Sequence, residues 1–351
     1  MKICRIDELK EGESLARAVF NTDYQILLAD GTIMTEDYID KLKSLGIIEV
    51  YIHDKNYRND EAVSVLKQDT EKLIHLNVKN ILEKHTYSHS KELQKLSQTA
   101  DEIITNIVNE KDVVDRIYDI RERSSDLYEH SISTCTLATL VALKLKLDKK
   151  KIHDISVACL LHDVGLRYLD FEYINRHLDD FNAVETTEYY KHPIYGYSSL
   201  KEEEWISELA KSIILYHHED INGSGFPLKI KGIPLEARIV SVCDFFDEMI
   251  CGISQKRKKV YEAIENLRVY SGIKYEKKVV NALLEFLAVY PVGSTVLTNS
   301  GELGIVIRQN RGFSDRPIIN VIRDKNGNAI KEPITIDMLD KKTIFIEKVV
   351  E

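Results

Sequence analysis

The sequence is poor in cysteine and proline, and it has no long apolar run. Its 351 residues include five cysteines, which are scattered and form no CxxC pair. A disulfide framework is therefore not expected, and Cys135, Cys159 and Cys243, which lie in apolar stretches, are predicted to be small core residues in a reducing cytosol. No apolar run reaches about 18 residues, and the first residues lack the apolar segment of a signal peptide. We therefore expect a cytoplasmic protein without a membrane span.

Positive charge is also scarce. Lys and Arg together number 48 against 57 Asp and Glu, which gives a net charge of −9. Non-specific binding of polymeric nucleic acid requires a basic surface, so this class of function is excluded. A small phosphate-containing substrate is not excluded, because bound metal ions can reverse the sign of the charge in a pocket.

The chain is too long for one ordinary core, and its pattern changes along the sequence. Residues 1–56 combine strand-like runs (ARAVF, YQILLA, IIEVYI) with one helix, TEDYIDKLKSLG, which Thr35 should cap and Gly46 should end. They predict a small α+β module. Residues 291–351 contain strand-like runs separated by the turns NSGE and DKNGNA, and they predict a small β-rich module.

Glycine and proline are absent from Ile47 to Val164, which favours long helices. Residues 57–120 are predicted to be a helical connector, because apolar side chains recur there at helical spacing. No strict heptad persists, which favours a core-packed helical hairpin over a dimeric coiled coil; a homodimer through these helices stays open. The histidines of this segment are expected in solvent: His75, His85 and His89.

Residues 121–290 are predicted to be all-helical, and they contain the residues with metal-binding chemistry. The candidate ligands, in the strings LYEHS, LLHDVG, KHPIYG, YHHEDINGSGFP and ARIVSVCDFFDE, are His130, His162, Asp163, His192, His217, His218 and Asp244. Mixed histidine and carboxylate ligands suit Fe, Mn or Zn. Two such metals close together suit the attack of water on phosphorus. The first hypothesis is therefore a metal-dependent phosphohydrolase.

Helical faces separate a candidate ligand pair from a similar dipeptide. In KIHDISVACLLHDVG, His162 continues the buried face of Ile155 and Ala158, and Asp163 follows directly. A buried imidazole beside a buried carboxylate needs partners, which a metal supplies. The His153–Asp154 pair lies nine residues earlier, on the opposite face at about 100° per residue, and is predicted to be in solvent.

The same geometric argument extends to the other helices. Asp244 and Asp247 share the apolar face of EARIVSVCDFFDEM, with Asp244 the better ligand and Asp247 the better hydrogen-bonding support. His192 precedes a proline, which fits a ligand held on a turn between helices. His130 begins a helical face, and Asp126, one turn earlier, can reach the same site.

The order of these strings resembles the HD-GYP family, a subset of the HD-domain phosphohydrolases. The resemblance covers about residues 120–290 and rests on LLHDVG, HPIYG, HHEDINGSGFP, IPLEARI and DFFD. The flanking segments ESLARAVFNTDYQILLADGTIMT and YPVGSTVLTNSGELGIV also resemble parts of bacterial HD-GYP proteins. The resemblance implies a mainly α fold, in which an all-helical HD-type domain at 121–290 carries the site and the two small modules flank it.

The family hydrolyses cyclic dinucleotides, chiefly cyclic di-GMP, to linear pGpG or GMP, with two or three iron or manganese ions. The resemblance implies that a metal-activated hydroxide attacks phosphorus at a centre containing His162 and Asp163. The implied ligands of one metal are His130, His162, Asp163 and Asp244. Those of the second are His192, His217 and His218, with Asp163 bridging. Asp126 takes the place of a Glu that binds a third metal in some members. The GYP triplet, which would contact substrate, is Gly225-Phe226-Pro227.

Three departures from the family pattern concern the substrate. The family's Lys after HDIG is Leu166, the Tyr of GYP is Phe226, and the phosphate-binding run after DxxD is CGISQKRKK, where Lys256 or Arg257 could substitute. Two alternatives to a cyclic di-GMP phosphodiesterase follow. One is a degenerate receptor that binds a cyclic dinucleotide with little hydrolysis. The other is an HD phosphohydrolase for another nucleotide, such as cyclic GMP-AMP.

Overall fold

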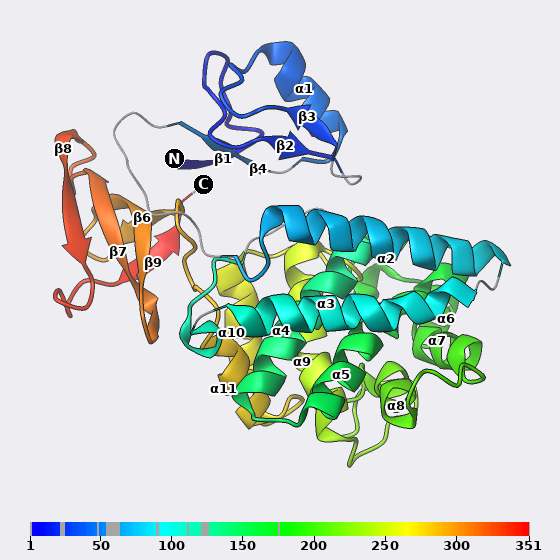
Figure 1. Cartoon of the computed structure of the whole chain (residues 1–351). Coiled ribbons are helices and arrows are strands. Elements are labelled where there is room, and N and C mark those ends of the chain that lie inside the picture. The colour runs from blue at the N-terminus through cyan, green and yellow to red at the C-terminus, as the bar shows by residue number, and fades with distance from the viewer. Residues whose placement is uncertain are drawn as a thin grey trace. The chain divides into compact units, whose positions relative to one another are not determined.

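The computed structural model describes residues 2–21, 25–47, 49–53, 64–88, 91–110, 112–120, 126–174 and 176–350. The chain divides into two compact units, and Figure 1 shows their elements. One unit comprises Met1–Ser64, Asp115–Ser124 and Leu287–Glu351; the other comprises Val65–Val114 and Ser125–Phe286. The fold is mainly α with a small N-terminal α+β part and a C-terminal β-rich part, as predicted.

The N-terminal part has two small antiparallel sheets and one helix. Strand β1 (Lys2–Arg5) pairs with β4 (Glu49–Ile52), and β2 (Val19–Phe20) pairs with β3 (Ile26–Leu28). Helix α1 (Glu36–Ser44) begins where the Thr35 hydroxyl accepts a hydrogen bond from the Tyr38 N–H at 3.3 Å. Gly46, with a φ of +73°, follows its end, so the predicted start and stop of this helix are confirmed.

The C-terminal part is one antiparallel sheet in the order β8-β7-β6-β5-β9. Its strands are β5 (Thr295–Thr298), β6 (Leu303–Asn310), β7 (Phe313–Arg323), β8 (Ala329–Asp337) and β9 (Ile346–Val349). Its core contains Val296, Val306, Ile319 and Met338. The NSGE and DKNGNA segments connect β5 to β6 and β7 to β8, as the turn residues predict.

Helices α2 (Gln68–Ser88) and α3 (Lys95–Asn109) form a hairpin, joined through the short 3₁₀ helix η1 (Lys91–Gln94), that packs on α4 (Leu127–Lys144) and α5 (Lys149–Leu161). The prediction of a core-packed hairpin is confirmed. The prediction that His75 lies in solvent is wrong: its side chain is buried, and its Nε2 lies 3.1 Å from Asp126 Oδ1. The side chains of His85 and His89 lie outside the described residues.

The helical unit positions the candidate histidine ligands near the ends of its helices, whereas Asp244 lies in the interior of α9 (Leu235–Cys251). Helix α4 packs between α5 and α9, and it is buried on nearly every face. The 3₁₀ helix η3 (His162–Tyr168) continues α5 and packs on α7 (His192–Leu200), which in turn packs on α8 (Glu208–Tyr216). The remaining elements are η2 (Val113–Asp115), η4 (Leu178–Asp180), α6 (Ala183–Tyr189), α10 (Val260–Tyr270) and α11 (Lys277–Leu284). Among the described helices, none is both long and apolar enough to cross a lipid bilayer.

Candidate metal centre

Two pairs of buried imidazole nitrogens converge inside the helical unit. The Nε2 atoms of His130 and His162 lie 3.2 Å apart, and so do those of His192 and His217. All four side chains are completely buried. Two imidazole nitrogens at this distance repel one another through their lone pairs unless a proton or a metal ion lies between them. Each pair therefore has the donor chemistry of a cation site.

The opposite nitrogen of three of these rings contacts the backbone of a helix end. The Nδ1 atoms of His162, His192 and His217 each lie 2.7 Å from the carbonyl oxygen three residues earlier. These carbonyls belong to the last turns of α5, α6 and α8, where no later helical N–H is available to them. An Nδ1–H that donates to such a carbonyl leaves Nε2 as the free lone pair, which is the tautomer a metal requires.

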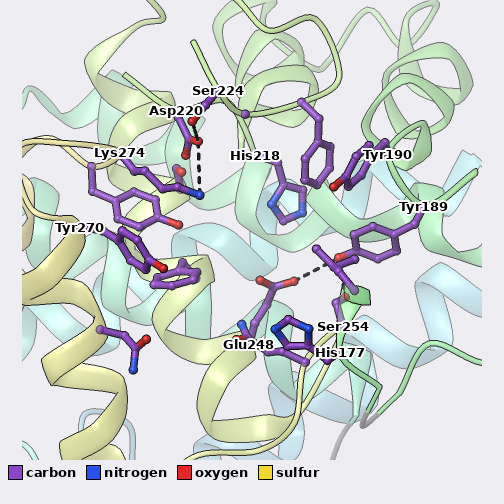
Figure 2. Close-up of a pocket in the computed structure, with 18 of the residues that line it drawn as sticks. His177, Tyr189, Tyr190, His218, Asp220, Ser224, Glu248, Ser254, Tyr270 and Lys274 are labelled. Carbon is purple, nitrogen blue, oxygen red and sulfur yellow. Dashed lines mark hydrogen bonds and ion pairs between the residues drawn. The ribbon is translucent and has the colours of Figure 1, made fainter. Parts of the chain in front are cut away.

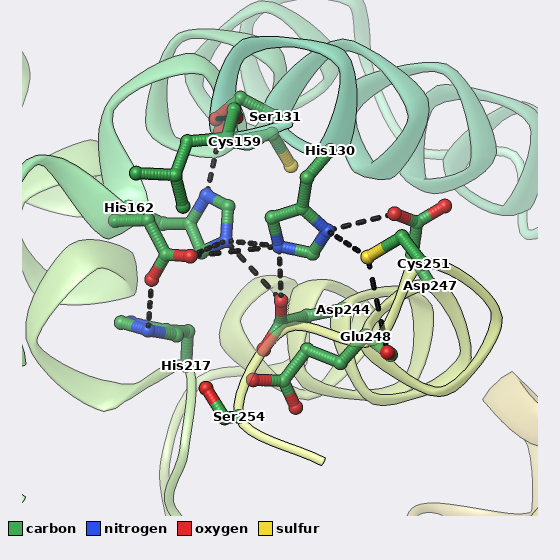
Figure 3. A network of polar contacts seen from close by, with 12 residues as sticks. His130, Ser131, Cys159, His162, His217, Asp244, Asp247, Glu248, Cys251 and Ser254 are labelled. Carbon is green, nitrogen blue, oxygen red and sulfur yellow. Dashed lines mark hydrogen bonds and ion pairs between the residues drawn. The ribbon is translucent and has the colours of Figure 1, made fainter. Parts of the chain in front are cut away.

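His130 is held by a carboxylate in place of a carbonyl. Its Nδ1 lies 2.7 Å from Asp247 Oδ2, while the other oxygen of Asp247 accepts a hydrogen bond from the Ser133 hydroxyl at 2.6 Å. Figure 3 shows this contact on the side of His130 that faces away from His162. Asp247 thus orients a candidate ligand through a hydrogen bond, as a carboxylate behind a metal-binding histidine does.

Asp163 lies between the two histidine pairs. Its Oδ2 is 3.5 Å from both His130 Nε2 and His162 Nε2, and its Oδ1 is 3.4 Å from His192 Nε2 and 3.6 Å from His217 Nε2. Each oxygen of one carboxylate therefore faces a different pair. The arrangement suits a carboxylate that is shared by two neighbouring cations.

Asp244 and His218 complete the cluster. Asp244 Oδ1 lies 3.0 Å from His130 Nε2 and 3.2 Å from His162 Nε2, and Asp244 Oδ2 lies 3.6 Å from His218 Nδ1. Within the described part of the chain, Asp244 Oδ2 and His218 Nε2 are buried and have no hydrogen-bond partner. Unsatisfied buried acceptors next to a histidine cluster fit a divalent cation, which would supply the missing partner. The seven predicted ligands make up two of the groups that could hold a metal ion: His130, His162 and Asp244; and Asp163, His192, His217 and His218.

The charges of the cluster are strongly coupled. Burial lowers the pKa of His192 to about 3 and holds the pKa of His218 well below its usual value, so both rings are neutral near pH 7. Burial also opposes charge on His130, but its hydrogen bonds to Asp244 and Asp247 outweigh it and raise the pKa of that ring. Protons and metal ions compete for the same Nε2 atoms, so the cluster has the linked titration of a metal-binding site.

Two glycines allow the ligands to approach one another. A Cβ on Gly165 would lie 1.9 Å from the carbonyl oxygen of His192, so only glycine lets η3 contact the start of α7. A Cβ on Gly225 would lie 2.3 Å from the carbonyl oxygen of His218. The chain therefore folds back onto the His218 segment, and it places the Phe226 ring against the His218 ring with centroids 4.5 Å apart.

A pocket of about 300 Å³ opens beside the cluster (Figure 2). His218 and Glu248 form its wall toward the cluster, and the opposite wall carries Tyr270 and Lys274. Its lining also includes Tyr189, Tyr190, Gly225, Phe226, Lys258, Asn266 and Tyr275. Pro227 does not line it. The volume and the mixture of aromatic rings, amides and ammonium groups suit part of a nucleotide.

The cations at this pocket are not the ones the sequence suggested. Lys256 is 72 % exposed and pairs with Asp180 at 3.7 Å, and the Arg257 guanidinium donates to the Cys251 carbonyl; neither lines the pocket. Lys258 and Lys274 line it instead. Leu166 is buried among apolar side chains, including Phe181 and Ile253, and contributes no charge.

Two further predicted residues lie away from the cluster. Asp126 caps α4 by accepting from the Glu129 N–H at 2.8 Å, and it contacts His75; it is in none of the ligand groups found among the described residues. His153 is only partly exposed, because α3 covers it and its Nε2 lies 3.1 Å from the Ser97 hydroxyl. Asp154 is buried, so the prediction that it lies in solvent is wrong; neither residue of the pair belongs to a ligand group among the described residues.

Comparison with known proteins places these features in a family. The model of the HD domain matches residues 78–279, more than half of the chain, and that of a KOW domain associated with HD domain matches residues 295–351. In the solved structures, Bd1817, an HDG"Y"P protein from Bdellovibrio bacteriovorus, is similar with a TM-score of 0.54 over 80% of this chain and 97% of its own. At 18% identity this likeness shows the fold.

The curated relatives carry phosphodiesterase names. Cyclic di-GMP phosphodiesterase PA4108 of Pseudomonas aeruginosa is 28% identical over 61% of this chain and 52% of its own length. The cyclic di-GMP phosphodiesterase response regulator RpfG of Xanthomonas campestris is 31% identical over 42% of this chain and 40% of its own. The 3′3′-cGAMP-specific phosphodiesterase 2 of Vibrio cholerae is 28% identical over 57% of this chain and 37% of its own. The chain thus spans about half or less of these relatives.

Proposed function

This chain belongs to the HD domain family, and we propose that it is a metal-dependent phosphodiesterase of the HD-GYP type that opens cyclic di-GMP to linear pGpG or GMP. The observation that carries the proposal is the position of Asp163, whose two oxygens each face a separate pair of histidine Nε2 atoms. Two adjacent cation positions joined by one carboxylate suit in-line attack on a phosphodiester. The phosphodiesterase names of the curated relatives support the same chemistry.

We assign two divalent ions, iron or manganese, to the two ligand groups. One group is His130, His162 and Asp244, the other is His192, His217 and His218, and Asp163 contacts both. Mixed imidazole and carboxylate donors suit these metals. Ions bound there lower the pKa of a water molecule and offset negative charge on the phosphate oxygens.

The residues around the ions have separate roles. Asp163 and His162 hold the centre of the site, where the attacking water must lie in line with the departing 3′ oxygen. Asp247 and the helix-end carbonyls fix the histidine rings, so no ring has to rotate during the reaction. Phe226 stacks on both His218 and Tyr190 and thereby holds the pocket wall.

The pocket fits the charge and shape of a cyclic dinucleotide. Such a ligand has two phosphodiester groups, each with one negative charge, and two flat bases. Lys258 and Lys274 supply two ammonium groups, and Tyr190 and Tyr270 supply ring faces for stacking. Gly225 lines the pocket with Phe226, whereas Pro227 does not.

The test is product formation by the full chain, purified without oxygen and loaded with Fe²⁺ or Mn²⁺. Chromatography of the products from cyclic di-GMP, cyclic di-AMP and 3′3′-cyclic GMP-AMP would identify the preferred substrate and the end product. We expect cyclic di-GMP to react fastest. Metal-loaded protein that hydrolyses none of the three would refute the proposal.

One observation favours a second candidate, a receptor with little hydrolytic activity. Leu166 is buried in an apolar cluster, so the family's lysine at this position has no equivalent at the site. A receptor would bind a cyclic dinucleotide tightly in calorimetry and release no product. Turnover by the wild-type protein would exclude this candidate, whichever dinucleotide is the substrate.

A further inference from the structure

Glu248 is a buried carboxylate that the two histidine-based groups do not use. It lies on α9 four residues after Asp244, one helical turn further along the same face. Glu248 is only 6% exposed, and one of its carboxylate oxygens lies within 4.8 Å of ligand atoms of both Asp244 and His218. Figure 3 shows the Glu248 carboxylate next to Asp244, and Figure 2 shows it in the wall of the pocket.

The protein groups around Glu248 offer it little compensation for burial. The Tyr189 hydroxyl lies 3.3 Å from its Oε1, and that hydroxyl is also hydrogen-bonded to Ser254. The described residues form no ion pair with Glu248 at 4.0 Å or less. The nearest charges include Asp244 and Asp163, which have the same sign. A buried carboxylate in these surroundings needs either a proton or a cation.

A second observation points to the cation. Asp244 Oδ2 is buried in a residue that is 1% exposed, and no described group gives it a hydrogen bond. His218 Nε2 is also buried and without a hydrogen-bond partner, although the His218 side chain as a whole is 13% exposed. Two unpartnered acceptors and the Glu248 carboxylate therefore lie close together beside the pocket. A single proton on Glu248 could satisfy only one of them, whereas a metal ion can contact several.

We propose that Glu248 is a further metal ligand, which together with Asp244 Oδ2 forms an oxygen-rich position for a divalent cation at the wall of the pocket, beside His218. Carboxylate oxygens favour Mn²⁺ over softer ions. The position extends the centre on which the proposed function rests, but it requires only metal binding and not hydrolysis. A cation held there would face the pocket, where it would add a positive charge toward a bound phosphate.

The experiment is calorimetric titration of Mn²⁺ into the chelator-treated full chain, for the wild type, Glu248→Gln and Glu236→Gln. Gln keeps the shape of a protonated Glu and removes the anionic ligand. Glu236 is the matched control, because it is a buried glutamate of the same helix that pairs with Lys151 at 2.9 Å and belongs to no ligand group. Glu248→Gln should lose one equivalent of Mn²⁺ or bind it at least about tenfold more weakly; Glu236→Gln should match the wild type.

Thermal melts without metal separate ligand loss from misfolding. Glu248→Gln should melt no lower than the wild type without Mn²⁺, because Gln keeps the shape of the protonated side chain, and should gain less stability when Mn²⁺ is added. A titration of Glu248→Gln that superimposes on the wild type would overturn the assignment, and so would an equal loss in Glu236→Gln.

Metal titration and product assays together distinguish a wrong ligand assignment from a wrong function. If metal-loaded wild type hydrolyses cyclic di-GMP while the Glu248→Gln titration is unchanged, the ligand assignment falls and the function stands. If Glu248→Gln loses Mn²⁺ affinity but no dinucleotide is hydrolysed by the wild type, the function falls and the assignment stands. A wild type that binds no Mn²⁺ overturns both.

Discussion

The metal centre and the pocket beside it share a wall, formed by His218 and Glu248, but they are built differently. In the centre, four histidines are completely buried and each is fixed by a contact of its second nitrogen. In the pocket, the positive charges are partly exposed lysines; the side chain of Lys274 is 40% exposed and lies 3.7 Å from Asp220. The fixed ligands of the centre suit a reaction, which requires atoms held in position. The lysines of the pocket suit recognition of a substrate, which tolerates charges that move.

The largest effect is expected from breaking the centre itself. His162→Ala or Asp163→Ala should abolish tight metal binding and reduce hydrolysis by about a thousandfold or more, because the several kcal/mol supplied by the metals is lost. Metal analysis and steady-state kinetics on the same preparations measure both effects.

The control for this prediction lies on the same helix. His153→Ala removes the imidazole of the other His–Asp pair, whose contact is with Ser97 and not with a ligand. It should leave metal content and kcat unchanged. Equal loss of metal in all three variants would show that the cluster is not what holds the ions.

The centre was predictable from sequence because its ligands obey local rules. His162 continues an apolar helical face, and the placement of Asp247 behind a ligand follows from its spacing to Asp244. The exposure of His153 was not predictable in the same way, since helical periodicity reports only which face a residue occupies. Whether another helix, here α3, covers that face depends on the tertiary fold.

The next largest effect is expected at Leu166, the position at which the family has a lysine. Leu166→Lys should lower the free energy of unfolding by about 3–5 kcal/mol, because it puts an unpaired charge into an apolar cluster. It should not raise activity. Denaturant unfolding measures the loss, and Leu166→Met, which conserves volume, should cost less than about 1.5 kcal/mol. A stable Leu166→Lys protein with faster turnover would mean that this side chain can reach the substrate.

The smallest effect is expected in the pocket. Lys258→Ala and Lys274→Ala should each raise KM about tenfold with little change in kcat. This loss is at the lower end of the free energy of a hydrogen bond to a charged group, because both lysines are partly exposed. Lys256→Ala is the matched control and should not change KM, since Lys256 lies outside the pocket. Kinetics at low and high salt measure the effect, which should shrink as salt increases. If Lys256→Ala raised KM as much, the division between pocket and surface would be lost.

The pocket was less predictable than the centre because distant segments form it. Lys258 precedes α10 and Lys274 follows it, so no spacing rule links them to each other or to His218. Glu248 did carry a signal, since it lies four residues after Asp244 on a helix whose apolar face already holds two carboxylates. His75 also carried one, since it lies between the apolar residues Ile74 and Leu76, but its contact with Asp126, 51 residues later in the chain, depends on the tertiary fold.

The carbonyl contacts of three histidines have a consequence for how this centre changes under mutation. A side-chain support can be lost by one substitution, but a backbone carbonyl is present whatever residue stands at Cys159, Tyr189 or Ile214. Three ligands therefore carry supports that point mutations cannot delete, and only His130 relies on a replaceable one, Asp247. Substitutions around the centre should therefore differ in their effects. Among these four contacts, only the one made by Asp247 can be removed by replacing a single side chain.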